Sequence, residues 1–331
     1  MTSVPVIDVG ALGAAGDIAS VARTIDRAAS DFGFFSIVNH GVDRALCERL
    51  EMLAREFFAR PTEEKQRVAM IHGGTAWRGW FPLHGELTSG TPDHKEGYYF
   101  GRELPRDDPR VRSGLALHGP NLWPAVPSEL RATGLEYLAA LETVGHRLTR
   151  AISLGLGFSA DELRDRWFRD PLTLLRLFRY PPGGPGAPAR GVAEHTDYGF
   201  LTLLWQDGTG GLEVRTDQGW IDVTPDPNAF VCNIGDMLER LSGGRYRSTP
   251  HRVRSPATND RIAIPFFFDP DWDARIDALA STDQVPDDAA TRWDETSVHA
   301  FDGTYGEYLM GKVGKVFPEL GAQVLAPIAP D

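Results

Sequence analysis

A histidine and an aspartate stand two residues apart in the chain, as His195 and Asp197. On an extended segment, side chains two residues apart point to the same side, so the imidazole and the carboxylate face a common point. These ligands suit Fe(II) and related divalent ions, and a chain with two cysteines excludes an all-thiolate zinc site. Because the chain has nine histidines and many aspartates, an accidental H-x-D pair is the competing explanation.

His251 is the candidate for a third ligand. It enters a predicted strand after a turn at Gly243 and Gly244, and two strands of one barrel can bring it opposite the first pair. A face of two histidines and one carboxylate leaves three positions open on one side of an octahedral ion. An oxygen-activating iron needs those positions to hold a cosubstrate and dioxygen together.

Arg261 stands ten residues after His251 and opens the apolar run 261–268. An arginine buried there without a partner is costly, so it requires an anion. At the floor of an iron pocket, its guanidinium fork would hold the far carboxylate of a dicarboxylic cosubstrate. The alternative is an Arg261 side chain that points outward into solvent at the start of the strand.

The elements that must position these residues are short strands. After Asp170 the apolar or alternating runs are 172–180, 200–206, 211–215, 229–234 and 261–268, several of them separated by glycine turns. This spacing predicts an antiparallel double-sheet barrel of the jelly-roll type. The segment from Asn233 to Asp236 is interpreted as a hairpin turn between two strands and not as a catalytic motif.

Helices are predicted around this β core. Residues 17–60 indicate two helices, the second capped by Asp43, with a short buried strand in 34–41 between them. Apolar residues at three- and four-residue steps predict one long scaffold helix over 127–157, and a last helix is expected over 305–317. Residues 70–120 show little periodicity and are interpreted as long loops and short extended pieces.

The whole chain, 1–331, is expected to be one domain of the α+β class with a mainly β core. Its regions are an N-terminal helical and loop region at 1–125, scaffold helices at 126–170, the iron-binding core at 171–270 and a C-terminal helical segment at 271–331.

Composition limits the classes of partner. The 331 residues are 42% hydrophobic and 24% charged, which is ordinary for a globular protein. The net charge of −12 repels polyanions, so a nucleic-acid partner is not expected. Cys47 and Cys232 are too few for a disulfide framework and favour the cytoplasm. No signal peptide or membrane span is expected, and the oligomeric state stays open.

The motifs in order resemble the isopenicillin-N-synthase-like family of non-haem Fe(II), 2-oxoglutarate-dependent oxygenases. The resemblance runs nearly from end to end, over Val4–Asp8, Gly33-Phe34-Phe35, Asn39-His40-Gly41, Arg179-Tyr180-Pro181, His195-Thr196-Asp197, Gly210-Gly211-Leu212, Asn233–Asp236, His251-Arg252-Val253 and Arg261-Ile262-Ala263.

The resemblance implies a double-stranded β-helix core that holds Fe(II) through His195, Asp197 and His251. It also implies 2-oxoglutarate as cosubstrate, with its 5-carboxylate on Arg261 helped by Tyr180, dioxygen as the second cosubstrate and ascorbate as a stimulant. The family usually has Arg-x-Ser at this point, whereas this chain has Ala263. Loss of that hydroxyl is expected to weaken cosubstrate binding by about 1 to 2 kcal/mol.

The same reasoning names six candidates for the substrate pocket. Strand alternation puts Phe267 and Val253 on inward faces, and Thr202 and Leu204 match positions that line the cavity in the family. Each has ordinary barrel core as its alternative. The aromatic residues Phe200 and Trp80 are expected to add a hydrophobic lining.

Two basic residues, Arg78 and Lys95, lie in a segment that resembles the one lying across the mouth of the pocket in many bacterial relatives. They are candidates for binding an acidic substrate, against the alternative of solvated or internally paired charges.

The expected activity is oxidation, by default hydroxylation, of an unactivated C–H bond in a small organic molecule, with release of succinate and CO2. Desaturation and ring closure are variants of the same outcome. One alternative is an iron oxidase of the same fold in which Arg261 holds the substrate's own carboxylate or bicarbonate. The other is a non-catalytic barrel that binds a metal or an organic acid.

Overall fold

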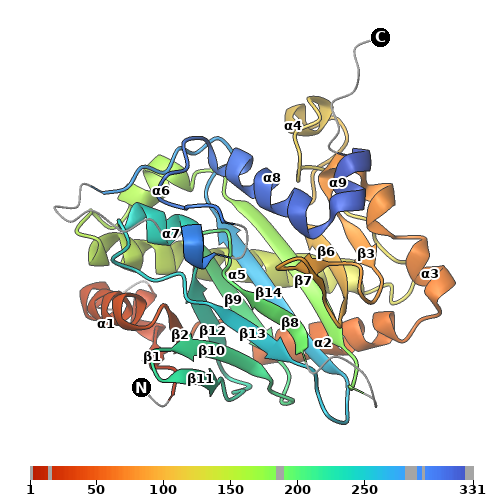
Figure 1. Cartoon of the computed structure of the whole chain (residues 1–331), viewed down its shortest axis with the longest axis horizontal. Helices are drawn as coiled ribbons and strands as arrows, with labels where there is room; N and C mark the ends of the chain where they lie inside the picture. Colours follow the sequence, from red (N-terminus) through yellow and green to blue (C-terminus); the bar gives the residue numbers. More distant parts are fainter. Residues whose placement is uncertain (1–2, 14–16, 184–189, 280–288, 293–294, 325–331) are drawn as a thin grey trace.

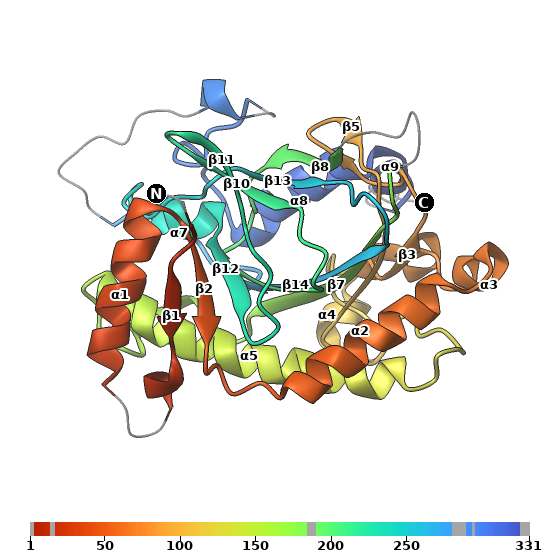
Figure 2. The same cartoon turned by 90° about the horizontal axis from the view of Figure 1, so that it is seen from below.

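Two facing β-sheets form the centre of the molecule. The computed structural model describes residues 3–13, 17–183, 190–279, 289–292 and 295–324. In these residues the sheets have eight and four strands, and no strand is hydrogen-bonded to both. Figure 2 shows β12, β14 and β7 on one side and β10, β13 and β8 on the other. The jelly-roll prediction is therefore confirmed as two opposed sheets rather than a closed barrel.

The larger sheet has the strand order β1-β2-β12-β9-β14-β7-β6-β3, and apart from the β1–β2 pair its described strand pairs are antiparallel. Its strands are β1 (Val6–Asp8), β2 (Phe34–Val38), β12 (Phe230–Ile234), β9 (Leu201–Gln206), β14 (Arg261–Asp269), β7 (Leu172–Tyr180), β6 (Glu96–Gly101) and β3 (Gly79–Phe81). The smaller sheet contains β11 (Gly219–Asp222), β10 (Leu212–Thr216), β13 (His251–Arg254) and β8 (Arg190–His195). β4 (Leu87–Thr88) and β5 (Thr91–Pro92) form a separate hairpin.

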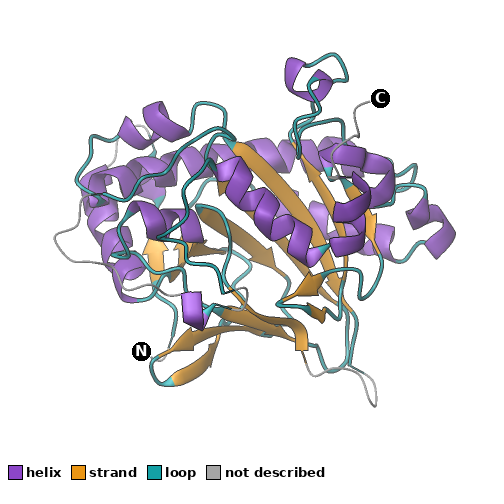
Figure 3. Cartoon of the chain, turned by 45° about the horizontal axis from the view of Figure 1, so that its top comes forward, coloured by secondary structure: helices purple, strands orange, loops and turns teal. Residues whose placement is uncertain are grey.

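Most helices lie around the larger sheet (Figure 1, Figure 3). The α-helices of the described residues are α1 (Ile18–Asp31), α2 (Arg44–Phe58), α3 (Thr62–Gln66), α4 (Pro109–Arg112), α5 (Leu130–Gly155), α6 (Glu162–Trp167), α7 (Asp236–Leu241), α8 (Tyr305–Val316) and α9 (Pro318–Val324). The predicted scaffold helix is α5, and the Asp43 side chain caps α2 by accepting from the backbone N–H of Ala45. In the described part of the chain, no helix is long and apolar enough to cross a membrane.

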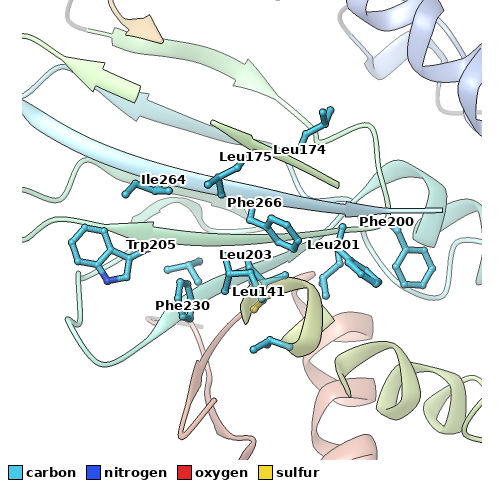
Figure 4. Packing of buried hydrophobic residues seen from close by; sticks show 14 of the residues in the cluster. Leu141, Leu174, Leu175, Phe200, Leu201, Leu203, Trp205, Phe230, Ile264 and Phe266 are labelled. Carbon is cyan, nitrogen blue, oxygen red and sulfur yellow. The ribbon is translucent and has the colours of Figure 1, made fainter. Parts of the chain in front are cut away.

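The period-two pattern of the central strands separates the hydrophobic core from the cavity. Leu175 of β7, Leu203 of β9 and Phe266 of β14 are fully buried and pack toward Leu141 of α5 (Figure 4). Their neighbours in sequence point to the opposite face, between the two sheets. Along each of these strands, alternate residues therefore have different roles: one set packs against the scaffold helix and the other lines a cavity.

One interpretation of the sequence becomes more specific in the structure, and another needs correction. Residues 70–120 do contain loops and short strands, but two of these strands belong to the central architecture, because β6 pairs with β7 and extends the larger sheet, and β3 pairs with β6. The segment from Asn233 to Asp236 is not a hairpin turn, because Asn233 belongs to β12 and Asp236 begins α7. The chain leaves the sheet at Gly235, where an added Cβ would lie 2.2 Å from the backbone oxygen of Gly199.

Candidate metal centre

His195, Asp197 and His251 converge on one point between the sheets. His195 ends β8 and His251 begins β13, and the two residues are cross-strand partners. The Nε2 atoms lie 3.9 Å (His195) and 3.8 Å (His251) from Oδ1 of Asp197. One ligand atom from each residue lies within 4.8 Å of the other two. The register of two antiparallel strands thus brings together residues that are far apart in the sequence.

Neighbouring groups orient each of the three side chains. Nδ1 of His195 lies 2.8 Å from the carbonyl oxygen of Ala193, and Nδ1 of His251 lies 3.3 Å from that of Thr249. A carbonyl oxygen only accepts, so both Nδ1 atoms carry the proton and both Nε2 lone pairs face the centre. The other oxygen of the aspartate, Oδ2 of Asp197, accepts from Thr202 Oγ1 at 2.5 Å and Asn233 Nδ2 at 2.7 Å. Its Oδ1 stays turned toward the imidazoles.

Burial and neighbouring groups together set the protonation states of the three side chains. Burial lowers the pKa of His195 and, together with the neighbouring imidazole, lowers the pKa of His251 to about 4. Burial acts to raise the pKa of Asp197, but the two imidazoles and the hydrogen bonds from Asn233 and Thr202 outweigh it and lower that pKa. Near pH 7 the three side chains therefore form two neutral nitrogen donors and one carboxylate.

Arg261 lies in the same cavity, on the first position of β14. Its side chain is 1% exposed and its guanidinium lies 4.9 Å from the ring centroid of Tyr180, its partner on β7. Nη2 donates to Oε1 of Gln206 at 2.9 Å, whereas Nε and Nη1 have no hydrogen-bond partner among the described residues. Ala263 follows on the same face and lines the same cavity. This region therefore offers a buried positive charge with two free donors.

Four of the six predicted pocket residues line the cavity, namely Thr202, Leu204, Val253 and Phe267. Phe200 and Trp80 are not among its lining residues. Phe200 packs against Phe168 with ring centroids 4.6 Å apart, and the indole N–H of Trp80 donates to Oε2 of Glu96. Phe200 precedes β9, the strand that carries Thr202 and Leu204. Trp80 lies on β3, at the edge of the larger sheet and separated from β14 by β6 and β7.

Helix α8 covers one end of the cavity through Leu309 and Val316. Tyr305, at the start of this helix, donates to Oδ2 of Asp269 at 2.6 Å and so fixes the helix to the end of β14. An outer hollow of about 960 Å³ shares His195 and Thr196 with the cavity. The metal-binding candidates therefore lie where an inner cavity meets a wider approach from outside.

The sequence did not single out three residues that matter here. Asn233 was interpreted as part of a turn, yet its amide holds Asp197; Gln206 anchors Arg261; and Arg176 lines the cavity from β7. Arg176 could have been found from alternation along β7, because it stands four residues before Tyr180 and so points to the same face of the strand. The contacts of Asn233 and Gln206 depend on which strands become neighbours, which no local pattern specifies.

The residues present fit the two groups that the sequence motifs imply. Two imidazole nitrogens and one carboxylate oxygen are a donor set for Fe(II) that leaves coordination positions open. The unpartnered donors of buried Arg261 match a carboxylate, which accepts two parallel hydrogen bonds from a guanidinium. Without such an anion, Arg261 would keep a buried charge with unmet hydrogen bonds, a costly arrangement.

Two family models together match most of the chain. Residues 4–126 match the family described as non-haem dioxygenase in morphine synthesis N-terminal, and residues 171–270 match the 2OG-Fe(II) oxygenase superfamily. The second match spans β7 to β14 and contains the His–Asp–His triad and Arg261.

Individual relatives extend over nearly the whole length. A probable iron/ascorbate oxidoreductase of Dictyostelium discoideum is 42% identical over 92% of this chain and 91% of its own length. A homoarginine-6-hydroxylase of Arabidopsis thaliana is 35% identical over 84% of this chain and 87% of its own. A full-length protein of Neurospora crassa, solved in complex with alpha-KG, has a TM-score of 0.76 at 27% identity and covers 94% of this chain and 96% of that one.

Similarity of this extent, on a fold whose two sheets enclose the triad, defines the class of enzyme and its cofactors. The chain belongs to the 2OG-Fe(II) oxygenase superfamily and is an Fe(II)- and 2-oxoglutarate-dependent oxygenase that uses dioxygen to oxidise small organic molecules.

Proposed function

We propose that His195, Asp197 and His251 hold Fe(II) through Nε2, Oδ1 and Nε2. The observation that carries this assignment is their convergence within 4.8 Å on a cavity that also contains the free donors of Arg261. Their neutral imidazoles and single carboxylate leave the centre with one negative charge, which favours a dication. Thr202 and Asn233 keep Asp197 from rotating, so that one carboxylate oxygen stays directed at the metal.

Arg261 is the proposed anchor for the distal carboxylate of 2-oxoglutarate, with Tyr180 beside it and Ala263 in place of the serine usual in the family. When bound, Fe(II) and 2-oxoglutarate would use dioxygen to oxidise a C–H bond of the substrate; one oxygen atom would enter the substrate and the other the succinate that decarboxylation of 2-oxoglutarate releases with CO2. The side chains position these groups: Arg261 fixes one end, and the triad leaves the opposite side of the metal open. The apolar lining at Val253 and Phe267 excludes water.

The outcome proposed for the substrate is hydroxylation, beside the face formed by Thr202, Leu204, Val253 and Phe267. The named relatives support a small substrate, because one is a homoarginine hydroxylase and the Neurospora crassa protein was also solved with thymine. We further propose a single-domain cytoplasmic enzyme, stimulated by ascorbate, that does not bind nucleic acid. The net charge of −12 supports the absence of nucleic-acid binding, the two buried free cysteines support the cytoplasm, and the iron/ascorbate oxidoreductase among the relatives supports the role of ascorbate.

Succinate release tests this function directly. Protein loaded with Fe(II) without oxygen, then supplied with 2-oxoglutarate, air and a panel of small organic molecules, is expected to form succinate faster with at least one panel member. Oxygen-dependent turnover of a substrate without succinate would contradict the proposed role of Arg261 and favour the oxidase alternative.

Asn233→Ala is expected to lower Fe(II) affinity by about 10- to 100-fold, because it removes a hydrogen bond that orients a ligand carboxylate. Competition with a chelator under anaerobic conditions measures the affinity. The matched control is Asn228→Ala, at an exposed asparagine outside the cavity. If both variants bind Fe(II) like the parent protein, Asp197 does not depend on Asn233 for its orientation.

Ala263→Ser is expected to tighten 2-oxoglutarate binding by about 5- to 10-fold, because the restored hydroxyl adds one hydrogen bond to the distal carboxylate. Ala263 is 2% exposed and shares its strand face with Arg261. Calorimetric titration of the metal-loaded protein without oxygen measures the change. Unchanged or weaker binding would place the cosubstrate's carboxylate away from position 263.

A further inference from the structure

A second arginine of the cavity, Arg176, has no role in the function proposed so far. It stands in the middle of β7 and, by alternation, shares the cavity face with Leu174 and Phe178. Its side chain is 18% exposed, and the other residues on this face of β7 are apolar or aromatic. A guanidinium in such surroundings is unfavourable unless an acceptor satisfies it.

Two aromatic rings hold the Arg176 guanidinium between them. Its central carbon lies 4.3 Å from the ring centroid of Tyr99 and 4.5 Å from that of Phe267. Stacking fixes the plane of the guanidinium and leaves its N–H edges available. No hydrogen bond joins Arg176 to any residue that the structure describes, and its buried Nε has no partner. The guanidinium is therefore held beside two rings and makes no hydrogen bond to the described residues.

Among the described residues, Glu86 is the acid within ion-pair distance of Arg176, and it is shared with other partners. Glu86 approaches Arg176 only to 3.7 Å, accepts from the Tyr99 hydroxyl at 2.8 Å and pairs with Lys95 at 2.8 Å. Lys95 also binds Asp93 at 2.5 Å. Of the two basic residues considered from the sequence, Lys95 is thus internally paired. The other, Arg78, donates to the Leu117 carbonyl and does not line the cavity.

Arg176 and Arg261 belong to different parts of the cavity. Arg261 pairs with Tyr180, which is four residues from Arg176, or about 13 Å along an extended strand. Phe267, which stacks on Arg176, is the cross-strand partner of Thr202, and Thr202 donates to Asp197. Arg176 thus lies level with the triad, beyond the proposed position of 2-oxoglutarate.

We propose that Arg176 binds the substrate and that the substrate is an organic acid, with a carboxylate on Arg176 and an apolar body against Phe267, Leu174 and helix α8. This inference rests on the proposed function, because it takes the Arg261 end as the cosubstrate site. A carboxylate supplies the paired hydrogen-bond acceptors that the fixed guanidinium lacks here, since Glu86 provides only a distant charge at 3.7 Å. The body is apolar because Leu309 and Val316 of α8 line the same cavity.

The test compares aliphatic and aromatic carboxylic acids with their own primary amides. Each is titrated without oxygen into protein holding Fe(II) and 2-oxoglutarate, and the change in the visible absorption spectrum reports binding; succinate release in air reports coupling. The variants are Arg176→Gln, which removes the charge, and Arg176→Lys, which keeps the charge but not the fork. Arg23→Gln, at an exposed arginine of α1, is the matched control.

The parent protein and Arg23→Gln are expected to prefer at least one acid over its amide by roughly 10- to 100-fold. In Arg176→Gln that preference disappears, in Arg176→Lys part of it remains, and 2-oxoglutarate affinity is unchanged in both. If Arg176 had only a structural role, substituting it would weaken the binding of acids and amides alike and leave the ratio of their affinities unchanged. Three results would overturn the proposal. They are an unchanged acid-to-amide ratio in Arg176→Gln, equal binding of acids and amides by the parent protein, and no binding of any acid in the panel. If the parent protein fails to bind 2-oxoglutarate, the proposed function itself fails, and this inference with it.

Discussion

Asp197→Ala is expected to abolish Fe(II) binding and succinate formation together. The substitution removes the only carboxylate of the triad and leaves two neutral imidazoles, which bind a dication far more weakly. Loss of a group that merely orients a ligand costs about 10- to 100-fold, so loss of the ligand itself should cost more than about 100-fold in metal affinity. Chelator competition and succinate assays measure the two effects.

The fold of this variant must be checked separately. Asp197 accepts hydrogen bonds from Thr202 and Asn233, so its removal also leaves two buried donors unpaired. Thermal unfolding of the metal-free proteins, with exposed Asp222→Ala as the matched control, measures that structural effect on its own. A folded Asp197→Ala protein that still binds one Fe(II) as tightly as the parent would contradict the proposed metal centre.

Arg261→Met is expected to weaken 2-oxoglutarate binding by roughly 100-fold, equivalent to about 3 kcal/mol for the loss of charge-assisted hydrogen bonds to a carboxylate. The same substitution should leave metal-free stability unchanged or raise it. The reason is that the Arg261 guanidinium is buried with two unpartnered donor nitrogens, and methionine removes the desolvated charge. Calorimetric titration and thermal unfolding give the two quantities.

These opposite changes distinguish a binding residue from a structural one. If Arg261 served only to fasten β14 to Gln206, the variant would lose stability and keep its affinity for 2-oxoglutarate. Fe(II) affinity is expected to stay within a few-fold of the parent value, because the triad does not contact Arg261. Unchanged affinity for 2-oxoglutarate would remove Arg261 from the proposed cosubstrate site.

The elements of the central sheet were predictable from the sequence because local patterns specify them. The run 172–180 coincides with β7, and the run 261–268 differs from β14 by one residue at its end. Alternation also predicts correctly that Phe267 and Val253 line the cavity. The long helix α5 follows from apolar residues at three- and four-residue steps, which need no knowledge of its partners.

What could not be predicted depends on contacts between distant segments. β6 was missed because its residues lack a simple alternation, since all six are buried within the larger sheet. The polar residues Asn233 and Gln206 contact Asp197 and Arg261 only because β12, β9 and β14 lie in one sheet. Trp80 was assigned to the pocket on its aromatic character alone, which does not specify the direction in which a side chain points.

An anaerobic titration tests the central assignment most directly. Protein is loaded with one equivalent of Fe(II) and titrated with 2-oxoglutarate while its visible absorption is recorded. We predict a new charge-transfer band that saturates at one 2-oxoglutarate per iron, is absent in Asp197→Ala and needs far more 2-oxoglutarate in Arg261→Met. A parent protein that binds Fe(II) but develops no such band at saturating 2-oxoglutarate would contradict the account.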